Sequence, residues 1–188
     1  AAGNSRDRAF ISCLYESGCR ISELLSLAVR QVQKHSHGFK ITVHGAKGPR
    51  RLLLLASTPH LAEWLNDHPR PDPRAPLWAT RTTPCRVMTY SRASDIIRLA
   101  AKQAGVTKPV NPHNFRHSRA THLANHLTEA QMNEYFGWVQ GSDMPSTYVH
   151  LSGRDVDNAL LKLHRIPVEE GADPGNGFSV RKCPMCEL

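Results

Sequence analysis

The most informative stretch of the chain reads H-N-F-R-H-S-R-A-T-H-L, from His113 to Leu123. It follows Pro112, a residue that suits the first turn of a helix, and we predict a helix over roughly 113–126. Residues three apart lie on one face of a helix, so His113 and Arg116 are expected to project together. A histidine at a helix start is often only a polar surface residue. The meaning of the pair therefore depends on what the rest of the chain places beside it.

Other residues with suitable chemistry lie far from this pair in the sequence. The segment G-C-R-I-S-E-L-L-S-L places Arg20 at a turn between two predicted helices, with Glu23 one helical turn later. Lys47 lies in a predicted hairpin turn, Trp138 follows Phe-Gly, and the segment S-T-Y-V-H-L contains Tyr148. Each has an ordinary explanation by itself, since turns favour exposed lysines and a tyrosine is commonly half-buried. Their order along the chain is the informative feature.

The spacing of apolar residues predicts a mainly α-helical domain with one small antiparallel β-sheet. The expected helices cover 5–17, 21–28, 59–67, 90–104, 113–126, 128–137, 143–151 and 152–164, and the expected strands cover 39–43 and 51–55. Residues 68–76 contain four prolines and are expected to form an exposed loop. We expect one domain over 1–167, followed by a polar, glycine-rich and flexible tail over 168–188.

The composition indicates a basic globular protein. Its 188 residues include 24 Lys and Arg against 16 Asp and Glu, which gives a net charge of +8 and a pI near 9.6. This balance favours a polyanionic partner such as nucleic acid. No apolar run approaches the roughly 20 residues that span a bilayer, so no membrane association is expected. Five scattered cysteines are typical of a reduced protein, and we expect a cytoplasmic location.

The residues quoted above occur in the order Arg, Lys, His-x-x-Arg, Trp, Tyr, which resembles the tyrosine recombinase (phage integrase) family. The resemblance covers residues 5 to 165 approximately and rests on three motifs together: G-C-R-I-S-E-L-L-S-L, H-N-F-R-H-S-R-A-T-H-L and S-T-Y-V-H-L. It implies the catalytic-domain fold of that family and the activity of a site-specific DNA recombinase. The last motif, extended to G-S-D-M-P-S-T-Y-V-H-L-S-G-R-D, is most similar to archaeal integrases of chromosomes, plasmids and viruses.

The resemblance also implies roles for individual residues. Tyr148 would attack a DNA phosphodiester, forming a 3′-phosphotyrosine and freeing a 5′-hydroxyl. Arg20 and Arg116 would grip the two non-bridging oxygens, and Lys47 would protonate the leaving 5′-oxygen. His113 would assist proton transfer at the tyrosine and contact the phosphate. With enough cationic donors around the phosphate, no metal or other cofactor is required.

Three details qualify these roles. Trp138 stands where most of the family has histidine; its indole N–H can donate to a phosphate oxygen but cannot transfer a proton back and forth. Glu23 is expected to orient Arg20 rather than touch DNA. In the hairpin, Arg50 and Arg51 are alternatives to Lys47 as the cationic residue.

Two groups of residues suggest metal binding on a first reading. His117, His122 and His126 have helical spacing, but we interpret them as ordinary helix-surface residues near DNA. Cys183 and Cys186 form a C-x2-C pair, which supplies only half of a zinc site. The pair belongs to a zinc module continuing beyond this chain, is completed by other Cys or His residues, or is free. We favour the first, and expect no metal within these residues.

The expected partner is double-stranded DNA, bound by a homotetramer in the synaptic complex that the resemblance implies. The family also has an N-terminal domain that closes a clamp around DNA, and without it we expect weak, salt-sensitive binding. Three alternatives stay open: a type IB topoisomerase-like nicking and closing activity, a non-catalytic DNA-binding domain of the same fold, and a zinc-dependent binding module. The target DNA sequence and the direction of the reaction are not predicted.

Overall fold

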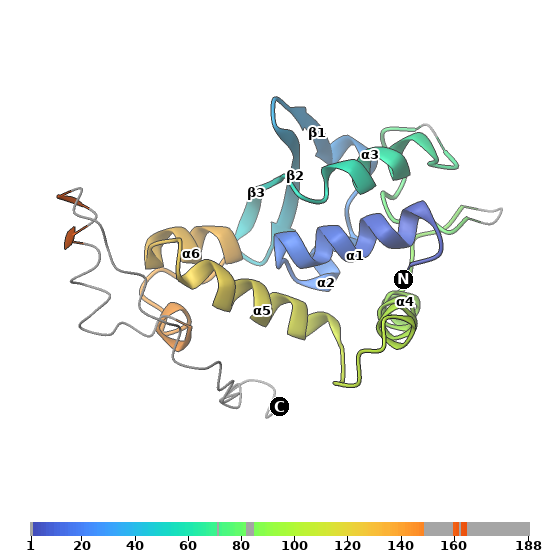
Figure 1. Ribbon diagram of the computed structural model, residues 1–188. Coiled ribbons are helices and arrows are strands. Elements are labelled where there is room, and N and C mark those ends of the chain that lie inside the picture. Colours follow the sequence, from blue (N-terminus) through green and yellow to red (C-terminus); the bar gives the residue numbers. More distant parts are fainter. Residues whose placement is uncertain (1, 71, 82–84, 149–159, 162, 165–188) are drawn as a thin grey trace. The chain divides into compact units, whose positions relative to one another are not determined.

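The computed structural model describes residues 2–70, 72–81, 85–148, 160–161 and 163–164. The chain divides into two units, residues 1–149 and residues 150–188. The helix predicted over 152–164 lies outside the described residues apart from 160–161 and 163–164, and the predicted tail lies wholly outside them. The first unit contains, in chain order (Figure 1), α1 (Ser5–Ser17), α2 (Ile21–Leu25), η1 (Val29–Gln31), β1 (Val32–His35), β2 (Gly38–Gly45), β3 (Gly48–Leu54), α3 (Thr58–Asn66), α4 (Tyr90–Gln103), α5 (Pro112–Ala124), α6 (Glu129–Phe136) and η2 (Pro145–Thr147).

Helix α1 is central to the first unit and contacts α3, α5 and β3 (Figure 1). It begins after Asn4, whose side chain accepts a hydrogen bond from a backbone N–H of the first turn at 3.0 Å. Phe10 and Leu14 on its inner face have no exposed surface. The helix ends at Gly18, whose φ of 54° lies in the left-handed region that favours glycine. The predicted bounds of this helix are confirmed.

The sheet has three antiparallel strands in the order β1–β2–β3, one strand more than predicted. Strands β2 and β3 pair as far as Gly45 and Gly48, so the hairpin turn falls where the sequence indicates it. Strand β1 was missed because it reads V-Q-K-H, with exposed polar residues at its centre. It is a strand because it pairs with β2, Val32 opposite Ile41, which its own composition does not indicate.

Two clusters of buried apolar side chains stabilise the unit. The larger cluster draws side chains from α1, α2, β2, β3, α3 and α4, and it includes the fully buried rings of Trp64 and Trp78. The smaller cluster lies where α5 and α6 meet, and Tyr148 packs against it. Its buried members are Ala120, Met132, Phe136 and Trp138. None of the helices in the described part of the chain has the length and apolar character needed to cross a membrane.

Helix α6 begins with a capping box. Thr128 Oγ1 accepts a hydrogen bond from the Gln131 N–H at 3.3 Å, and Gln131 Oε1 accepts one from the Thr128 N–H at 2.9 Å. The chain then turns at Gly137, whose φ is 64°. This turn directs the following residue, Trp138, back into the smaller cluster.

Two predicted helices are shorter in the structure. The helix predicted over 21–28 ends at Leu25, and the Ser26 hydroxyl donates to the Glu23 carbonyl at 2.9 Å and closes the last turn. The helix predicted over 143–151 is, within the described residues, the single 3-10 turn η2. There the Ser146 hydroxyl donates to the backbone carbonyl of Asp143 at 2.6 Å, a local bond that competes with helix continuation.

Glu16 connects α1 to the segment between β3 and α3. Its carboxylate accepts hydrogen bonds from the backbone N–H groups of Leu55, Ala56 and Ser57 and from the Ser57 hydroxyl, at 2.6–2.9 Å. Burial raises the pKa of Glu16, but these hydrogen bonds outweigh burial and leave the pKa below its ordinary value.

Replacing Glu16 by glutamine is expected to lower the free energy of unfolding at pH 7 by at least about 2 kcal/mol, because hydrogen bonds to a charged acceptor contribute about 1.5–3 kcal/mol. The folded-state pKa is depressed, so this stabilisation is complete above the ordinary value of 4.5 and is lost as the pH falls through the lower folded-state pKa. Urea unfolding at pH 7 and pH 3 measures both effects. An equal difference between the two proteins at both pH values contradicts the assignment.

Candidate active site

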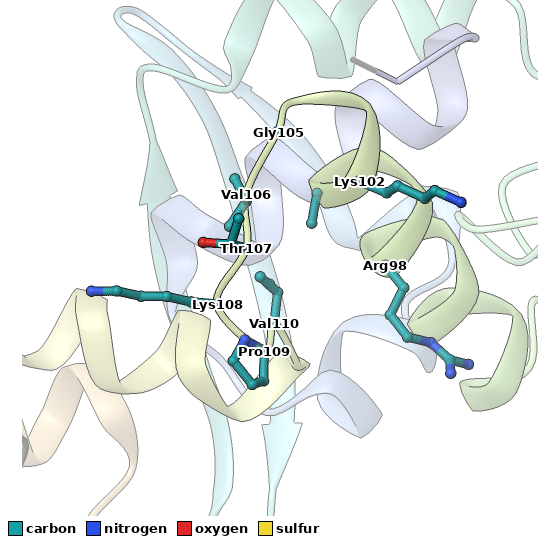
Figure 2. A pocket seen from close by; sticks show the side chains of 9 residues that line it. Arg98, Lys102, Gly105, Val106, Thr107, Lys108, Pro109 and Val110 are labelled. Carbon is teal, nitrogen blue, oxygen red and sulfur yellow. The ribbon is translucent and has the colours of Figure 1, made fainter.

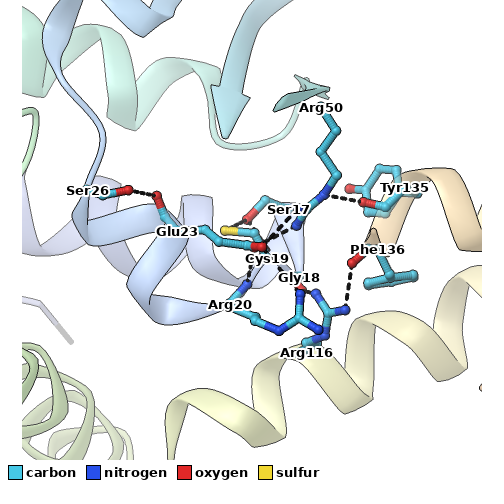
Figure 3. Close-up of polar contacts among 10 residues, drawn as sticks. All are labelled: Ser17, Gly18, Cys19, Arg20, Glu23, Ser26, Arg50, Arg116, Tyr135 and Phe136. Atoms are coloured by element: carbon cyan, nitrogen blue, oxygen red, sulfur yellow. Dashed lines mark hydrogen bonds and ion pairs between the residues drawn. The ribbon is translucent and has the colours of Figure 1, made fainter. Parts of the chain in front are cut away.

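Glu23 is a buried carboxylate at which β3 and the start of α2 meet. It accepts two hydrogen bonds from the Arg50 guanidinium, at 2.9 and 2.6 Å, and one from the Arg20 backbone N–H at 2.8 Å (Figure 3). The Arg20 side chain lies 3.4 Å from the same carboxylate. Burial raises the pKa of Glu23, but the bonds and charges of Arg50 and Arg20 outweigh it and keep the pKa below the ordinary value. Glu23 is therefore ionised at neutral pH.

Arg50 belongs to the site in its own right, although the sequence suggested it only as an alternative to Lys47. Its side chain is 9% exposed, and its Nε donates to the Tyr135 carbonyl at 3.0 Å, which connects β3 to α6. A signal for this position exists in the sequence. In β3, residues two apart share a face, and Arg50 shares its face with the buried Leu52 and Leu54.

Arg116 is held by two backbone carbonyls inside the unit. Its Nη1 donates to the Gly18 carbonyl at 3.1 Å and its Nη2 donates to the Phe136 carbonyl at 2.7 Å (Figure 3). The guanidinium also lies over the rings of Phe136 and Trp138, 5.0 and 5.6 Å from their centroids. Gly18 permits the close packing of Arg119 and Phe136 against this turn, because a Cβ there would lie 2.9 Å from their side-chain atoms.

The cluster carries more positive than negative charge. Three guanidinium groups, those of Arg20, Arg50 and Arg116, are arranged around the carboxylate of Glu23 (Figure 3). Burial first, and then the charge of Arg20, lower the pKa of Arg116 to about 10. Arg20 is half exposed, so its guanidinium is accessible from solvent. An anion with two oxygens beside Arg20 and Arg116 would relieve this repulsion, so the cluster suits a phosphate group.

Tyr148 lies at the edge of this cluster, on the face of Trp138. The two rings stack with centroids 5.6 Å apart and an angle of 3° between their planes. Trp138, which is 8% exposed, in turn stacks on Phe136 at 4.8 Å. The indole thus contacts both the Tyr148 ring and the Arg116 guanidinium. Tertiary packing brings the predicted nucleophile and the predicted phosphate-binding arginine onto one aromatic support.

The Tyr148 hydroxyl forms a hydrogen bond with Nδ1 of His117. The interpretation of His117 as an ordinary helix-surface residue is therefore wrong: its ring is partly buried and contacts the predicted nucleophile. His113, the residue predicted to act there, lies one turn earlier on α5 with an exposed side chain, edge-on to the His117 ring at 4.2 Å. Burial first, then the charges of Arg116 and Arg20, lower the pKa of His113. The signal for His117 was its i,i+4 spacing from His113.

Lys47 lies in the exposed turn between β2 and β3, as predicted, and not within the buried cluster. The part of the chain that the structure describes contains no group of three or more His, Cys, Asp or Glu side chains suited to a metal ion. Cys183 and Cys186 lie outside that part. A shallow hollow at the end of α4, lined by Arg98, Lys102, Val106 and Lys108 among others, shares no residue with the cluster around Arg116 (Figure 2).

With this geometry established, comparison with known proteins identifies the family. The model of the phage integrase family matches residues 1–154, and the chain belongs to that family. Tyrosine recombinase XerD of Pseudomonas putida is 31% identical over 152 residues, which cover 77% of this chain and 49% of that protein. Tyrosine recombinase XerD of Ralstonia nicotianae is 33% identical over 167 residues, covering 85% and 48%. The chain thus spans about half the length of these curated relatives.

Solved structures agree on the fold. The XerA recombinase superposes with a TM-score of 0.67 at 23% sequence identity, covering 89% of this chain and 59% of that one. The XerH site-specific recombinase, solved with its difH substrate in a pre-cleavage complex, superposes with a TM-score of 0.66 at 21% identity. This match covers 84% of this chain and 46% of that one. The predicted fold, a tyrosine recombinase catalytic domain that is mainly helical with a small antiparallel sheet, is confirmed. The finer resemblance to archaeal integrases stays a prediction.

Proposed function

We propose that this chain is the catalytic domain of a site-specific DNA recombinase that cuts and rejoins strands through a 3′-phosphotyrosine bond to Tyr148. The observation that carries the proposal is the contact of one indole, Trp138, with both the Tyr148 ring and the Arg116 guanidinium. A nucleophile must lie in line with the phosphorus while cations hold the non-bridging oxygens. The contacts of Trp138 with both groups support such a relative placement.

The contacts in the structure support the proposed roles. Arg20 and Arg116 take the non-bridging oxygens, since a forked guanidinium matches a phosphate better than a point charge does. The two carbonyls that hold Arg116 fix its orientation before DNA binds. Glu23 and Arg50 keep the Arg20 turn in place. The free energy of the broken phosphodiester is retained in the phosphotyrosine, so rejoining needs no nucleotide cofactor.

Several properties of the whole protein belong to the same proposal. We expect double-stranded DNA as the partner, a homotetramer as the synaptic assembly, and an intracellular, nucleoid-associated location. A catalytic domain over 1–167 with a separate tail also stays a proposal. The basic net charge of +8 supports a polyanionic partner.

A covalent-capture experiment on a mixture of DNA sites tests the function. The protein is incubated with a pool of duplexes whose central base pairs are randomised and which carry a nick beside them. After cleavage the short 5′-hydroxyl fragment diffuses away and rejoining is prevented. We expect a protein–DNA species on a denaturing gel, with the 3′-phosphate mapped to Tyr148 by mass spectrometry. Plasmid relaxation without exchange between two duplexes would instead favour the topoisomerase-like activity, and binding without capture would favour a non-catalytic domain.

The role of Lys47 has its own test. Lys47→Ala is expected to slow cleavage of an unmodified duplex, of a sequence that the wild type captures, by about 100-fold or more, the usual range for loss of a general acid. A duplex with sulfur in place of the bridging 5′-oxygen needs no protonation of its leaving group, so it should restore the rate of this variant to near that of the wild type. Single-turnover rates measure both. If the sulfur duplex restores the rate of Arg50→Ala and not that of Lys47→Ala, the role belongs to Arg50.

A further inference from the structure

We propose that His117, not His113, exchanges the proton with the Tyr148 hydroxyl when the phosphotyrosine bond forms and breaks. This inference rests on the proposed function and assigns the nucleophile's proton to a residue outside the predicted set. It makes His117 a catalytic residue, because His117 contacts a reacting atom.

The geometry gives the assignment. His113 and His117 stand one turn apart on α5, with ring centroids 4.2 Å apart. Tyr148 approaches from η2, and its hydroxyl is hydrogen-bonded to Nδ1 of His117. The Tyr148 ring also stacks on the face of Trp138, with the two ring planes parallel within 3°. The ring of Tyr148 is thus oriented by Trp138 while its hydroxyl is directed to His117.

The proposal requires the neutral His117 tautomer in which Nδ1 accepts the Tyr148 hydrogen. Nε2 is buried and has no hydrogen-bond partner among the described residues. A neutral imidazole has one donor and one acceptor, so a ring that accepts the Tyr148 hydrogen at Nδ1 carries its own hydrogen on Nε2. The charged and titratable groups that face His117 are His113 and Arg116 from α5 and Tyr148 from η2. Burial first, then the charges of His113 and Arg116, lower the pKa of His117, which favours the neutral form that can accept a proton.

The step balances without any further reactant. During cleavage the Tyr148 O–H bond breaks, its proton moves to Nδ1 of His117, the Oη–P bond forms and the P–O5′ bond breaks. The 5′-oxygen takes a proton from the proposed general acid, Lys47. During rejoining the 5′-hydroxyl returns that proton and attacks phosphorus, and the departing phenol oxygen recovers its proton from His117. His113 remains beside Arg116 and Arg20 as a phosphate contact.

One test needs no DNA. In long-range proton–nitrogen NMR spectra of the full chain, the Nδ1 and Nε2 signals of His113 and His117 are followed against pH. The hydrogen bond from Tyr148 stabilises the neutral ring, so Tyr148→Phe is expected to raise the pKa of His117 and leave that of His113 nearly unchanged. A shift confined to His113, or no shift at His117, overturns the inference.

A second test uses the duplex that the wild-type protein captures. In His117→Asn the amide oxygen can replace Nδ1 as acceptor and keep the phenol in place, but it cannot take up a proton. Its single-turnover cleavage rate at pH 7 is expected to be lower than that of the wild type by about 100-fold or more. As the pH becomes alkaline, the rate of the variant should continue to rise, whereas the wild-type rate levels off. His113→Asn is the matched control. We expect it to cleave more slowly than the wild type but with the same dependence of the rate on pH. Melting temperatures of both variants check the fold.

The outcomes separate the two proposals. If the wild type captures no DNA, the proposed function fails and this inference fails with it. If the wild type captures DNA and His117→Asn retains the wild-type pH profile while His113→Asn loses it, only this inference fails. The NMR titration of the wild type and Tyr148→Phe decides the matter independently should His117→Asn melt far below the wild type.

Discussion

Replacing Tyr148 by phenylalanine is expected to abolish capture of nicked DNA, with a loss of about ten-thousandfold or more, as is found when a nucleophile is removed. The variant keeps the aromatic ring that stacks on Trp138 and loses the hydroxyl, which bonds to His117. The free energy of unfolding should therefore change by only about 0.5–1.5 kcal/mol. Non-covalent DNA binding should persist, because the arginines that we propose to hold the phosphate are untouched. A denaturing gel measures capture, and a mobility shift on the same duplex measures binding.

The matched control is Tyr90→Phe, which removes the hydroxyl from an exposed tyrosine at the start of α4. It should capture DNA as the wild type does. Undiminished capture by Tyr148→Phe would mean that another residue is the nucleophile, and mass spectrometry of the captured peptide would identify it. Loss of both capture and binding would point instead to a disturbed fold, which the melting temperature would reveal.

Glu23→Gln is expected to produce the largest loss of stability. The substitution keeps the shape of the side chain but leaves the buried guanidinium of Arg50 without its counter-charge. Removing one partner of a buried ion pair costs about 3–5 kcal/mol, which corresponds to a melting temperature lower by about 10 °C in a chain of this size. Because the pKa of Glu23 is depressed, this difference is complete above the ordinary value of 4.5 and shrinks as the pH falls through the folded-state pKa. Calorimetry at pH 7 and pH 3 measures both.

The exposed ion pair between Arg8 and Glu63 provides the comparison. Glu63→Gln should change stability by less than about 1 kcal/mol, since exposed pairs contribute little. Adding Arg50→Met to Glu23→Gln removes the uncompensated charge and should recover much of the lost stability. Comparable losses for Glu23→Gln and Glu63→Gln would show that burial of the Arg50 pair is not the source of the effect.

The sequence by itself determined the local elements whose signals lie within a few residues. The end of helix α1 at Gly18 and the capping box at Thr128 follow from capping chemistry, and both agree with the structure. The order of motifs was also sufficient for the family, because it depends on residue types and spacing alone. Strand β1 was missed for the opposite reason: its polar residues form a strand only by pairing with β2.

Only the tertiary structure decided which side chains meet. Arg50 and Glu23 are distant in sequence, and their ion pair exists because β3 packs against the start of α2. The bond between Tyr148 and His117 likewise depends on packing, because η2 contacts α6 and the following Tyr148 side chain reaches α5. Sequence spacing places His113 and His117 on one face of a helix but does not determine which of them contacts the tyrosine. That preference depends on how far each ring stands from the incoming phenol, a distance that is determined by packing between segments rather than by the order of residues.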